Sequence, residues 1–141
     1  MSATTPDLLN LLKTTLEKVA APWIVDLGLT VLEAGPQRTV LALPVTPRLV
    51  HGGGVLCGQA MLAAADTAMV LALTAAEGAF RPMTTVQLQT SFLRPVPADT
   101  PSLQVVCTVL RRGKTLAFGE IELLTPDGRL AAHATTTYAL L

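Results

Sequence analysis

Hydrophobic residues follow three different spacings along this chain. From residue 7 to residue 19 they recur every three or four positions, which predicts an amphipathic N-terminal helix that Pro22 ends. From Cys57 to about residue 77 almost every residue is apolar, which predicts a long helix that is enclosed by protein and ends near Gly78. Elsewhere, long runs rich in Val, Leu, Thr and Phe alternate with turn residues, as is typical of strands.

The strand-like runs fall into two groups. Ile24 to Glu33 and Arg38 to Leu43 are separated by a turn at residues 34–36 and predict a first hairpin. Four more runs follow the long helix: Thr84 to Leu93, Ser102 to Arg111, Lys114 to Thr125 and Arg129 to Leu140. The breaks between these four are short, so we expect each to pair with the next as an antiparallel hairpin. The order predicts an α+β hotdog fold, in which a sheet wraps around one long central helix.

Composition narrows the classes of function. The 141 residues are 50% hydrophobic and 14% charged, which suits a single domain over residues 1–141. With so few charges a monomer would expose apolar surface to water, so we expect a homo-oligomer that covers it. A formal net charge of zero gives no attraction to nucleic acid. The two cysteines form no CxxC pair, and the N-terminus does not resemble a signal peptide. We therefore expect no metal or disulfide framework, and a cytoplasmic location.

The apolar segment from Val55 to Ala76 is about long enough to cross a bilayer. Asp66 lies at its centre, where an ionised residue costs roughly 2.5 to 3.5 kcal/mol on insertion. No second such segment follows, so we interpret it as a core helix and expect no membrane partner.

Asp66 is itself the first candidate for chemistry. Its helical neighbours three and four positions away are all apolar: Leu62, Ala63, Met69 and Val70. Aspartate is a poor residue inside a helix, and a buried carboxylate without partners costs roughly several kcal/mol, so the position needs a reason. Catalysis is one reason; a cap on another element or an ion pair with a buried arginine is the alternative.

A glycine-rich loop, His51-Gly52-Gly53-Gly54, precedes the long helix. Either it only turns the chain, or it lets a ligand approach the helix start, where the Gly58 N–H could bind an oxyanion. Gly58 and Asp66 are eight residues apart, roughly 12 Å along one helix, which is too far to flank one carbonyl. Two helices lying antiparallel across a twofold axis would bring Gly58 of one subunit to Asp66 of the other.

Several stretches together resemble the PaaI-like hotdog thioesterases along nearly the whole chain beyond residue 45. They are VLCGQAMLAAADTAMVLAL, TTVQLQTSFLRPV, VLRRGKTLAFGEIEL and DGRLAAHATTTYAL. The family has a His-Gly pair at the helix start and an acid eight residues after that glycine, which correspond to Cys57-Gly58 and Asp66. Gly54 also matches the family pattern, whereas His51 replaces an Asn and Cys57 replaces the His.

The resemblance implies hydrolysis of acyl-CoA without a cofactor. Gly58 would polarise the thioester carbonyl, and Asp66 of the other subunit would act as general base or nucleophile. Thr85, or its neighbour Thr84, would assist the acid, and His51 would donate a hydrogen bond to substrate or water. Cys57 is either an apolar filler or a thiolate, and the latter would make a Cys-His acyl transferase.

Basic residues offer candidate contacts for the CoA phosphates. Arg111, Arg112 and Lys114 surround a glycine turn, and Arg94 precedes a proline, although solvated turn residues have the same pattern. With Cys57, Gly54 and Thr84 they complete the candidate substrate-binding set. The alternatives to an acyl-CoA thioesterase are a non-catalytic acyl-CoA-binding domain and a hotdog hydratase or dehydratase using His51 and Asp66. We expect a homodimer, paired into a homotetramer, and the acyl group is open.

Overall fold

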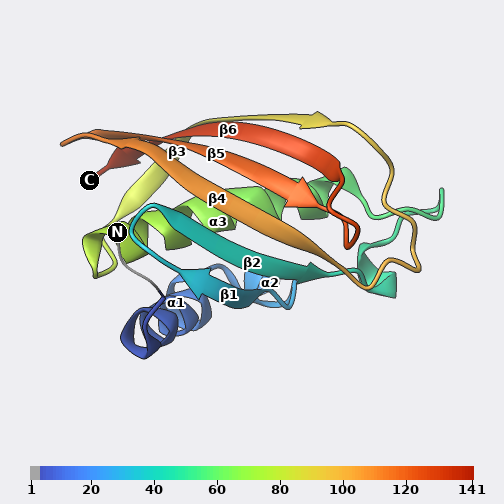
Figure 1. The fold of residues 1–141 in the computed structure, drawn as a ribbon, viewed down its shortest axis with the longest axis horizontal. Helices are drawn as coiled ribbons and strands as arrows, with labels where there is room; N and C mark the ends of the chain where they lie inside the picture. The colour runs from blue at the N-terminus through green and yellow to red at the C-terminus, as the bar shows by residue number, and fades with distance from the viewer. Residues whose placement is uncertain (1–3) are drawn as a thin grey trace.

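The computed structural model describes residues 4–141. It contains α1 (Pro6–Val19), α2 (Pro22–Val25), η1 (Pro47–Leu49) and α3 (Gly58–Glu77). The strands are β1 (Thr30–Ala34), β2 (Arg38–Pro44), β3 (Met83–Phe92), β4 (Ser102–Arg112), β5 (Leu116–Leu124) and β6 (Leu130–Leu140). Figure 1 shows the sheet curving around α3, with α1 beside the β1–β2 edge. The predicted α+β hotdog fold is confirmed.

The six strands form one antiparallel sheet in the order β1-β2-β4-β5-β6-β3. The predicted hairpins β1–β2, β4–β5 and β5–β6 are confirmed, each closed by a short turn. The predicted pairing of β3 with β4 is wrong. β3 pairs along its whole length with β6 and lies at the edge of the sheet, so residues 93–101 are a crossover and not a hairpin turn.

Prolines in the crossover explain this difference. Pro95, Pro97 and Pro101 lack the N–H that a hairpin ladder needs, and Leu56 instead donates its N–H to the carbonyl of Val96. The segment is therefore tied to the loop before α3, and both sides of β4 are already paired, with β2 and with β5.

The predicted strand from Ile24 to Glu33 is also wrong in its first half. Pro22 stands at the first position of α2, where its fixed φ favours a helical turn, and β1 begins only at Thr30. Gly28 has a φ of 79°, which turns the chain from α2 towards β1. The apolar residues before Thr30 therefore cover α3 from a helix, where the sequence pattern had indicated a strand.

The long helix α3 is a core element. It contacts α1, α2 and strands β2 to β6, and 72% of its most apolar 18-residue window is buried. It starts at Gly58, with Cys57 as N-cap, and ends at Gly78, whose φ of 81° allows the left-handed cap. This is the burial expected of the central helix of a globular domain. One narrow stripe stays partly exposed: Gly58, Leu62, Asp66 and Val70.

The other face of α3 packs closely against the sheet. A methyl group added at Gly119 of β5 would come within 2.8 Å of the Cε of Met69, so any side chain at this position would require the Met69 side chain to move. The thiol of Cys107 lies 3.8 Å from the sulfur of Met69, and burial raises its pKa to about 12. Cys107 is thus an inert core residue.

Candidate active site

Asp66 lies in the third turn of α3, on the partly exposed stripe and not in the closed core. Within residues 4–141 no ion pair includes Asp66, so the alternative of a buried arginine partner is not met. The carboxylate instead accepts hydrogen bonds from two hydroxyl groups, those of Thr85 and Tyr138. Both donors belong to strands that are far from α3 in the sequence.

Thr85 reaches the carboxylate from β3. Its Oγ1 lies 3.0 Å from Oδ1 and 3.3 Å from Oδ2 of Asp66. The register of β3 against β6 shifts between Thr85 and Gln87, and such a bulge re-aims the side chains beside it. Thr84, the alternative predicted from the sequence, is next along the strand and therefore points to the opposite face.

Tyr138 reaches the same carboxylate from β6, directly across the ladder from Thr85. Its hydroxyl donates to Oδ1 of Asp66 at 2.5 Å and lies 3.2 Å from the backbone carbonyl of the same residue. Burial and then the hydrogen bond to Asp66 raise the pKa of Tyr138 far above its ordinary value, so the phenol remains a donor. Tyr138 is a buried core residue, and its contact with Asp66 was not predicted from the sequence.

These contacts leave the two carboxylate oxygens unequal. Oδ1 receives both short hydrogen bonds, whereas Oδ2 has only the longer one from Thr85. Oδ2 therefore has lone pairs free for a ligand or a water. The site combines a fixed orientation with one open oxygen.

The start of α3 offers backbone donors. Cys57, the N-cap, makes no side-chain capping bond, so the first N–H groups of the helix, beginning with that of Gly58, lack a side-chain acceptor. The ring of Phe92 lies beside Gly58, where an added methyl group would be 3.4 Å away, an ordinary contact. Gly58 and Asp66 lie eight residues apart on the same straight helix, so one chain does not bring them together.

The loop before α3 is a tight turn. The N–H of Gly54 donates to the carbonyl of His51 at 2.9 Å, and Gly54 has a φ of 80°. Nδ1 of His51 accepts from the N–H of Gly53 at 2.8 Å, and a methyl group on Gly53 would lie 2.7 Å from the imidazole. These glycines let the chain reverse, and the exposed imidazole keeps Nε2 free.

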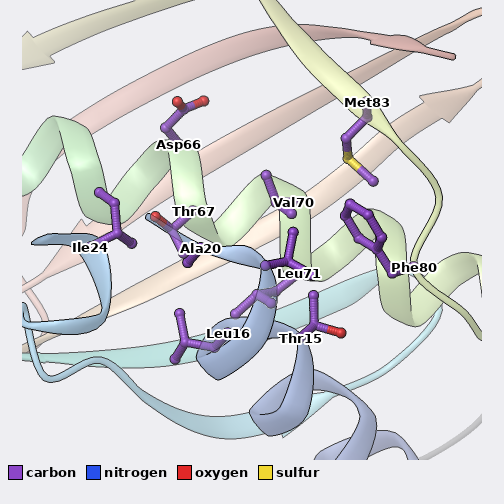
Figure 2. A pocket seen from close by; sticks show the side chains of 11 residues that line it. Thr15, Leu16, Ala20, Ile24, Asp66, Thr67, Val70, Leu71, Phe80 and Met83 are labelled. Carbon is purple, nitrogen blue, oxygen red and sulfur yellow. The ribbon is translucent and has the colours of Figure 1, made fainter. Parts of the chain in front are cut away.

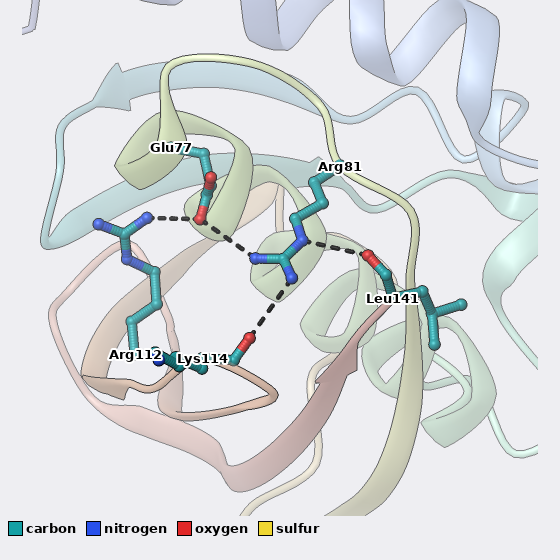
Figure 3. Close-up of polar contacts among 5 residues, drawn as sticks. All are labelled: Glu77, Arg81, Arg112, Lys114 and Leu141. Carbon is teal, nitrogen blue, oxygen red and sulfur yellow. Dashed lines mark hydrogen bonds and ion pairs between the residues drawn. The ribbon is translucent and has the colours of Figure 1, made fainter.

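The basic candidates lie at opposite ends of α3. Arg112 makes an ion pair with Glu77 at 2.6 Å, in the last turn of α3, and Arg81 joins the same carboxylate and the backbone carbonyl of Lys114 (Figure 3). Arg94 comes two residues after Phe92, whose ring lies beside Gly58 at the start of α3, and it donates to the carbonyl of Leu130 at 3.0 Å. The structure therefore does not gather Arg94, Arg112 and Lys114 into one cluster.

Beside Asp66 is a cleft of about 220 Å³ between α1, α2 and α3 (Figure 2). In the figure, the side chains of α1 and α3 face each other across it, and Phe80 and Met83 close one end. Its lining residues are Thr15, Leu16, Val19, Ala20, Ile24, Asp66, Thr67, Val70, Leu71, Phe80 and Met83. Trp23, the second residue of α2, is 61% exposed and does not line this cleft.

Comparison with known proteins decides the family. The model of the thioesterase superfamily matches residues 50–132, which contain α3 and most of the sheet. The Saccharolobus solfataricus protein named "Putative esterase SSO2140" is 31% identical over 116 residues, or 82% of this chain and 79% of that protein. This chain belongs to the thioesterase superfamily.

Solved structures agree with this assignment. A mutant of the phenylacetic acid degradation protein PaaI from Thermus thermophilus is 26% identical, with a TM-score of 0.76 over 86% of this chain and all of that one. The PaaI protein of E. coli is 18% identical and shows the same fold, with a TM-score of 0.82 over 96% of this chain and 94% of that one. The predicted resemblance to PaaI-like hotdog thioesterases is confirmed, and the chain is a thioester hydrolase.

Within this thioesterase the predicted site residues fall into two groups. Asp66 and Thr85 are in direct contact. Gly58 and Cys57 lie at the start of α3, two helical turns from Asp66, and His51 lies in the loop before it. Tyr138 is the one contact of Asp66 that sequence reasoning missed. The available signal was alternation: Tyr138 shares a face of β6 with the core residues Ala134 and Thr136, which points it towards α3.

Proposed function

We propose that this thioesterase hydrolyses acyl-CoA, with Asp66 as the group that acts on water or on the thioester carbonyl. The observation that supports this most is the pair of hydroxyl donors on Oδ1, from Thr85 and Tyr138, with Oδ2 left open. Such second-layer hydrogen bonds fix a catalytic group in one orientation. A carboxylate that only stabilised the fold would have no use for an open oxygen on a partly exposed helix face.

The oxyanion donor in this proposal is the N–H of Gly58 from a second subunit. The uncapped start of α3 supports the role, because unpaired N–H groups and the helix dipole favour negative charge. The exposed stripe on α3 and the edge strand β3 support the dimer: Val86 and Phe92 of β3 are 60% and 48% exposed. Burying these apolar side chains in a homodimer places two composite sites across a twofold axis.

The reaction has two forms that these groups can serve. As general base, Oδ2 of Asp66 takes a proton from water while the water oxygen attacks the carbonyl carbon, and the C–S bond then breaks to give acid and CoA thiolate, which takes up the proton. As nucleophile, Oδ2 attacks the carbonyl carbon, and the C–S bond breaks to give a mixed anhydride and CoA thiolate. Water then hydrolyses the anhydride to the free acid and the Asp66 carboxylate, and its proton goes to the thiolate. In both forms the negative charge on the carbonyl oxygen is stabilised by Gly58 of the partner subunit.

The remaining candidates would bind the substrate. Nε2 of His51, on the exposed turn before α3, is available to donate to the thioester or the water. Cys57 and Gly54 border the same region, whereas Thr84 faces away from Asp66 and is not assigned to the site. Arg94, near the start of α3, and the pair Arg112 and Lys114, near its end, are alternative contacts for the CoA phosphates, and Arg112 would have to leave Glu77. We also propose that two such dimers pair into a tetramer and that the enzyme is cytoplasmic.

Thiol release from a panel of acyl-CoAs tests this function. Asp66→Asn is expected to lower kcat by about 100-fold or more, as for loss of an acid–base group. Asp99→Asn, in the exposed crossover, is the matched control and is expected to keep full activity. Equal rates for wild type and Asp66→Asn would exclude the mechanism, and CoA binding without any turnover would identify a non-catalytic acyl-CoA-binding protein.

A further inference from the structure

The loop that carries His51, residues 49–57, is hydrogen-bonded across its own two sides. At its base the N–H of Cys57 donates to the carbonyl of Leu49 at 2.8 Å. Nearer its tip the N–H of His51 donates to the carbonyl of Val55 at 3.1 Å. The loop extends past the start of α3 (Figure 1). Because Cys57 is the N-cap of α3, the backbone of His51 is held in a fixed relation to the helix start.

The imidazole of His51 is held by Gly53. Its Nδ1 accepts the N–H of Gly53 at 2.8 Å, and a methyl group on Gly53 would lie 2.7 Å from Cε1 and 3.1 Å from Nδ1 of the ring. A ring nitrogen that accepts an N–H has no proton of its own, so the neutral ring carries its one proton on Nε2. In this arrangement His51 presents a donor and keeps no free lone pair with which to remove a proton.

We propose that Gly53 is a positioning residue: its N–H fixes the tautomer of His51, and its missing side chain leaves room for the ring. His51 then directs the N–H of Nε2 at the oxygen of the thioester or of the attacking water, on the Gly58 side of the composite site. This inference rests on the proposed function, because the donor needs a reacting thioester. It also separates the thioesterase from the hydratase alternative, in which His51 would act as a base and would need a free lone pair.

Gly53 and Gly52 form a matched pair of variants. Neither has a positive φ, so alanine fits the backbone at both positions. A methyl group on Gly52 meets nothing within 4 Å, whereas one on Gly53 displaces the imidazole. The side chain of His51 is exposed and can rotate away, so Gly53→Ala should remove the hydrogen bond between the two residues and leave the fold intact. Tm measurements check that both variants are folded.

Nitrogen NMR of the imidazole rings is the first part of the test. The sequence has two histidines, His51 and His133, so a His133→Gln variant assigns the two sets of signals. At about pH 8.5 a free imidazole is neutral. His51 should then carry its proton on Nε2 in the wild type and in Gly52→Ala, and should share it between both nitrogens in Gly53→Ala. A shared proton in the wild type, or an unchanged spectrum in Gly53→Ala, would overturn the proposal.

Turnover is the second part, measured with the acyl-CoA that the wild type hydrolyses fastest. His51→Ala and Gly53→Ala are each expected to lower kcat by about fivefold to tenfold, as for one hydrogen bond between neutral groups, while Gly52→Ala stays within about twofold. A glycine needed only for the fold would lower kcat in any background, whereas a positioning glycine acts only through His51. The double variant His51→Ala/Gly53→Ala should therefore be no slower than His51→Ala alone.

The two parts separate this inference from the proposed function. If no thioester is turned over but the spectra are as expected, the proposed function fails and the tautomer assignment stands. If turnover is normal but Gly53→Ala is as fast as the wild type, or the losses from the two substitutions add, Gly53 is not a positioning residue and the function stands. If thioesters are not turned over and Gly53→Ala leaves the spectrum unchanged, both are overturned.

Discussion

The hydroxyl of Tyr138 lies 2.5 Å from Oδ1 of Asp66, although 72 positions separate the two residues in the chain. Thr85, paired with Tyr138 across the β3–β6 ladder, contacts the same oxygen. An edge strand and the last strand thus meet at a single helical carboxylate.

Tyr138→Phe keeps the buried ring and removes both hydroxyl contacts with Asp66. A hydrogen bond to a charged group contributes about 1.5–3 kcal/mol, so kcat is expected to fall about tenfold or more. KM should change little, because the hydroxyl orients the carboxylate and does not face the cleft. Steady-state kinetics separates the two constants; a rise in KM at constant kcat would instead assign Tyr138 to substrate binding.

Tyr138 also predicts an alkaline pH dependence. Its pKa is raised in the folded protein, first by burial and then by Asp66, so folding favours the protonated phenol. Its contribution to stability is complete below the ordinary pKa of about 10 and declines as pH rises above that value. Because this is the only tyrosine of the sequence, the near-ultraviolet absorbance of tyrosinate reports on it alone. That absorbance should appear together with unfolding; a titration near pH 10 in the folded protein would contradict this.

Thr85 and Thr84 form a natural pair of variants on β3. Thr85→Ala removes the hydroxyl that bonds both carboxylate oxygens of Asp66, and we expect kcat to fall about tenfold, in the range of one hydrogen bond to a charged group. Thr84→Ala alters the opposite face of the strand and should stay within about twofold. The measurement is kcat with the acyl-CoA of the panel that the wild type turns over fastest. A larger loss for Thr84→Ala than for Thr85→Ala would rule out the assigned role.

The composite site predicts complementation between two inactive variants. Gly58→Pro removes the N–H at the first position of α3, where proline fits the backbone, and is expected to lower kcat by about 100-fold. Asp66→Asn removes the acid from the other half of the site. In a mixed dimer of the two variants, one site keeps both Gly58 and Asp66.

Co-expression with two different affinity tags isolates that mixed dimer. It should recover about half of the wild-type rate if each site draws on two subunits, since one of two sites is intact. If the mixed dimer forms normally but is inactive, a working site does not combine Gly58 of one subunit with Asp66 of the other, and the composite site is excluded.

Periodicity predicted most elements of the fold because each element buries one defined face. The N-terminal helix, the apolar central helix and three hairpins were located from spacing and turn residues alone. The position of β3 was not, because a short break between strands indicates pairing only when a tight turn closes it. The prolines of residues 95–101 excluded such a turn, and that evidence was in the sequence.

The site was predictable only where a residue conflicts with its surroundings. Asp66 stood out because its helical neighbours are apolar, and Thr85 was found through a family resemblance. Tyr138 conflicts with nothing: an aromatic residue on the inner face of a strand is an ordinary core residue. Only the register of β6 against β3 and α3 shows that its hydroxyl meets the carboxylate.

The placement of β3 next to β6 has a consequence for synthesis on the ribosome. β3 has no strand partner until β6 has been translated, although about forty residues separate the end of one strand from the start of the other. The carboxylate of Asp66 therefore lacks the hydroxyl of Tyr138, and Thr85 lacks the paired strand that fixes its position, until β6 has been translated. A chain that ends before residue 138 has no tyrosine to orient the acid, so β6 must pair with β3 before Asp66 is held in its native orientation.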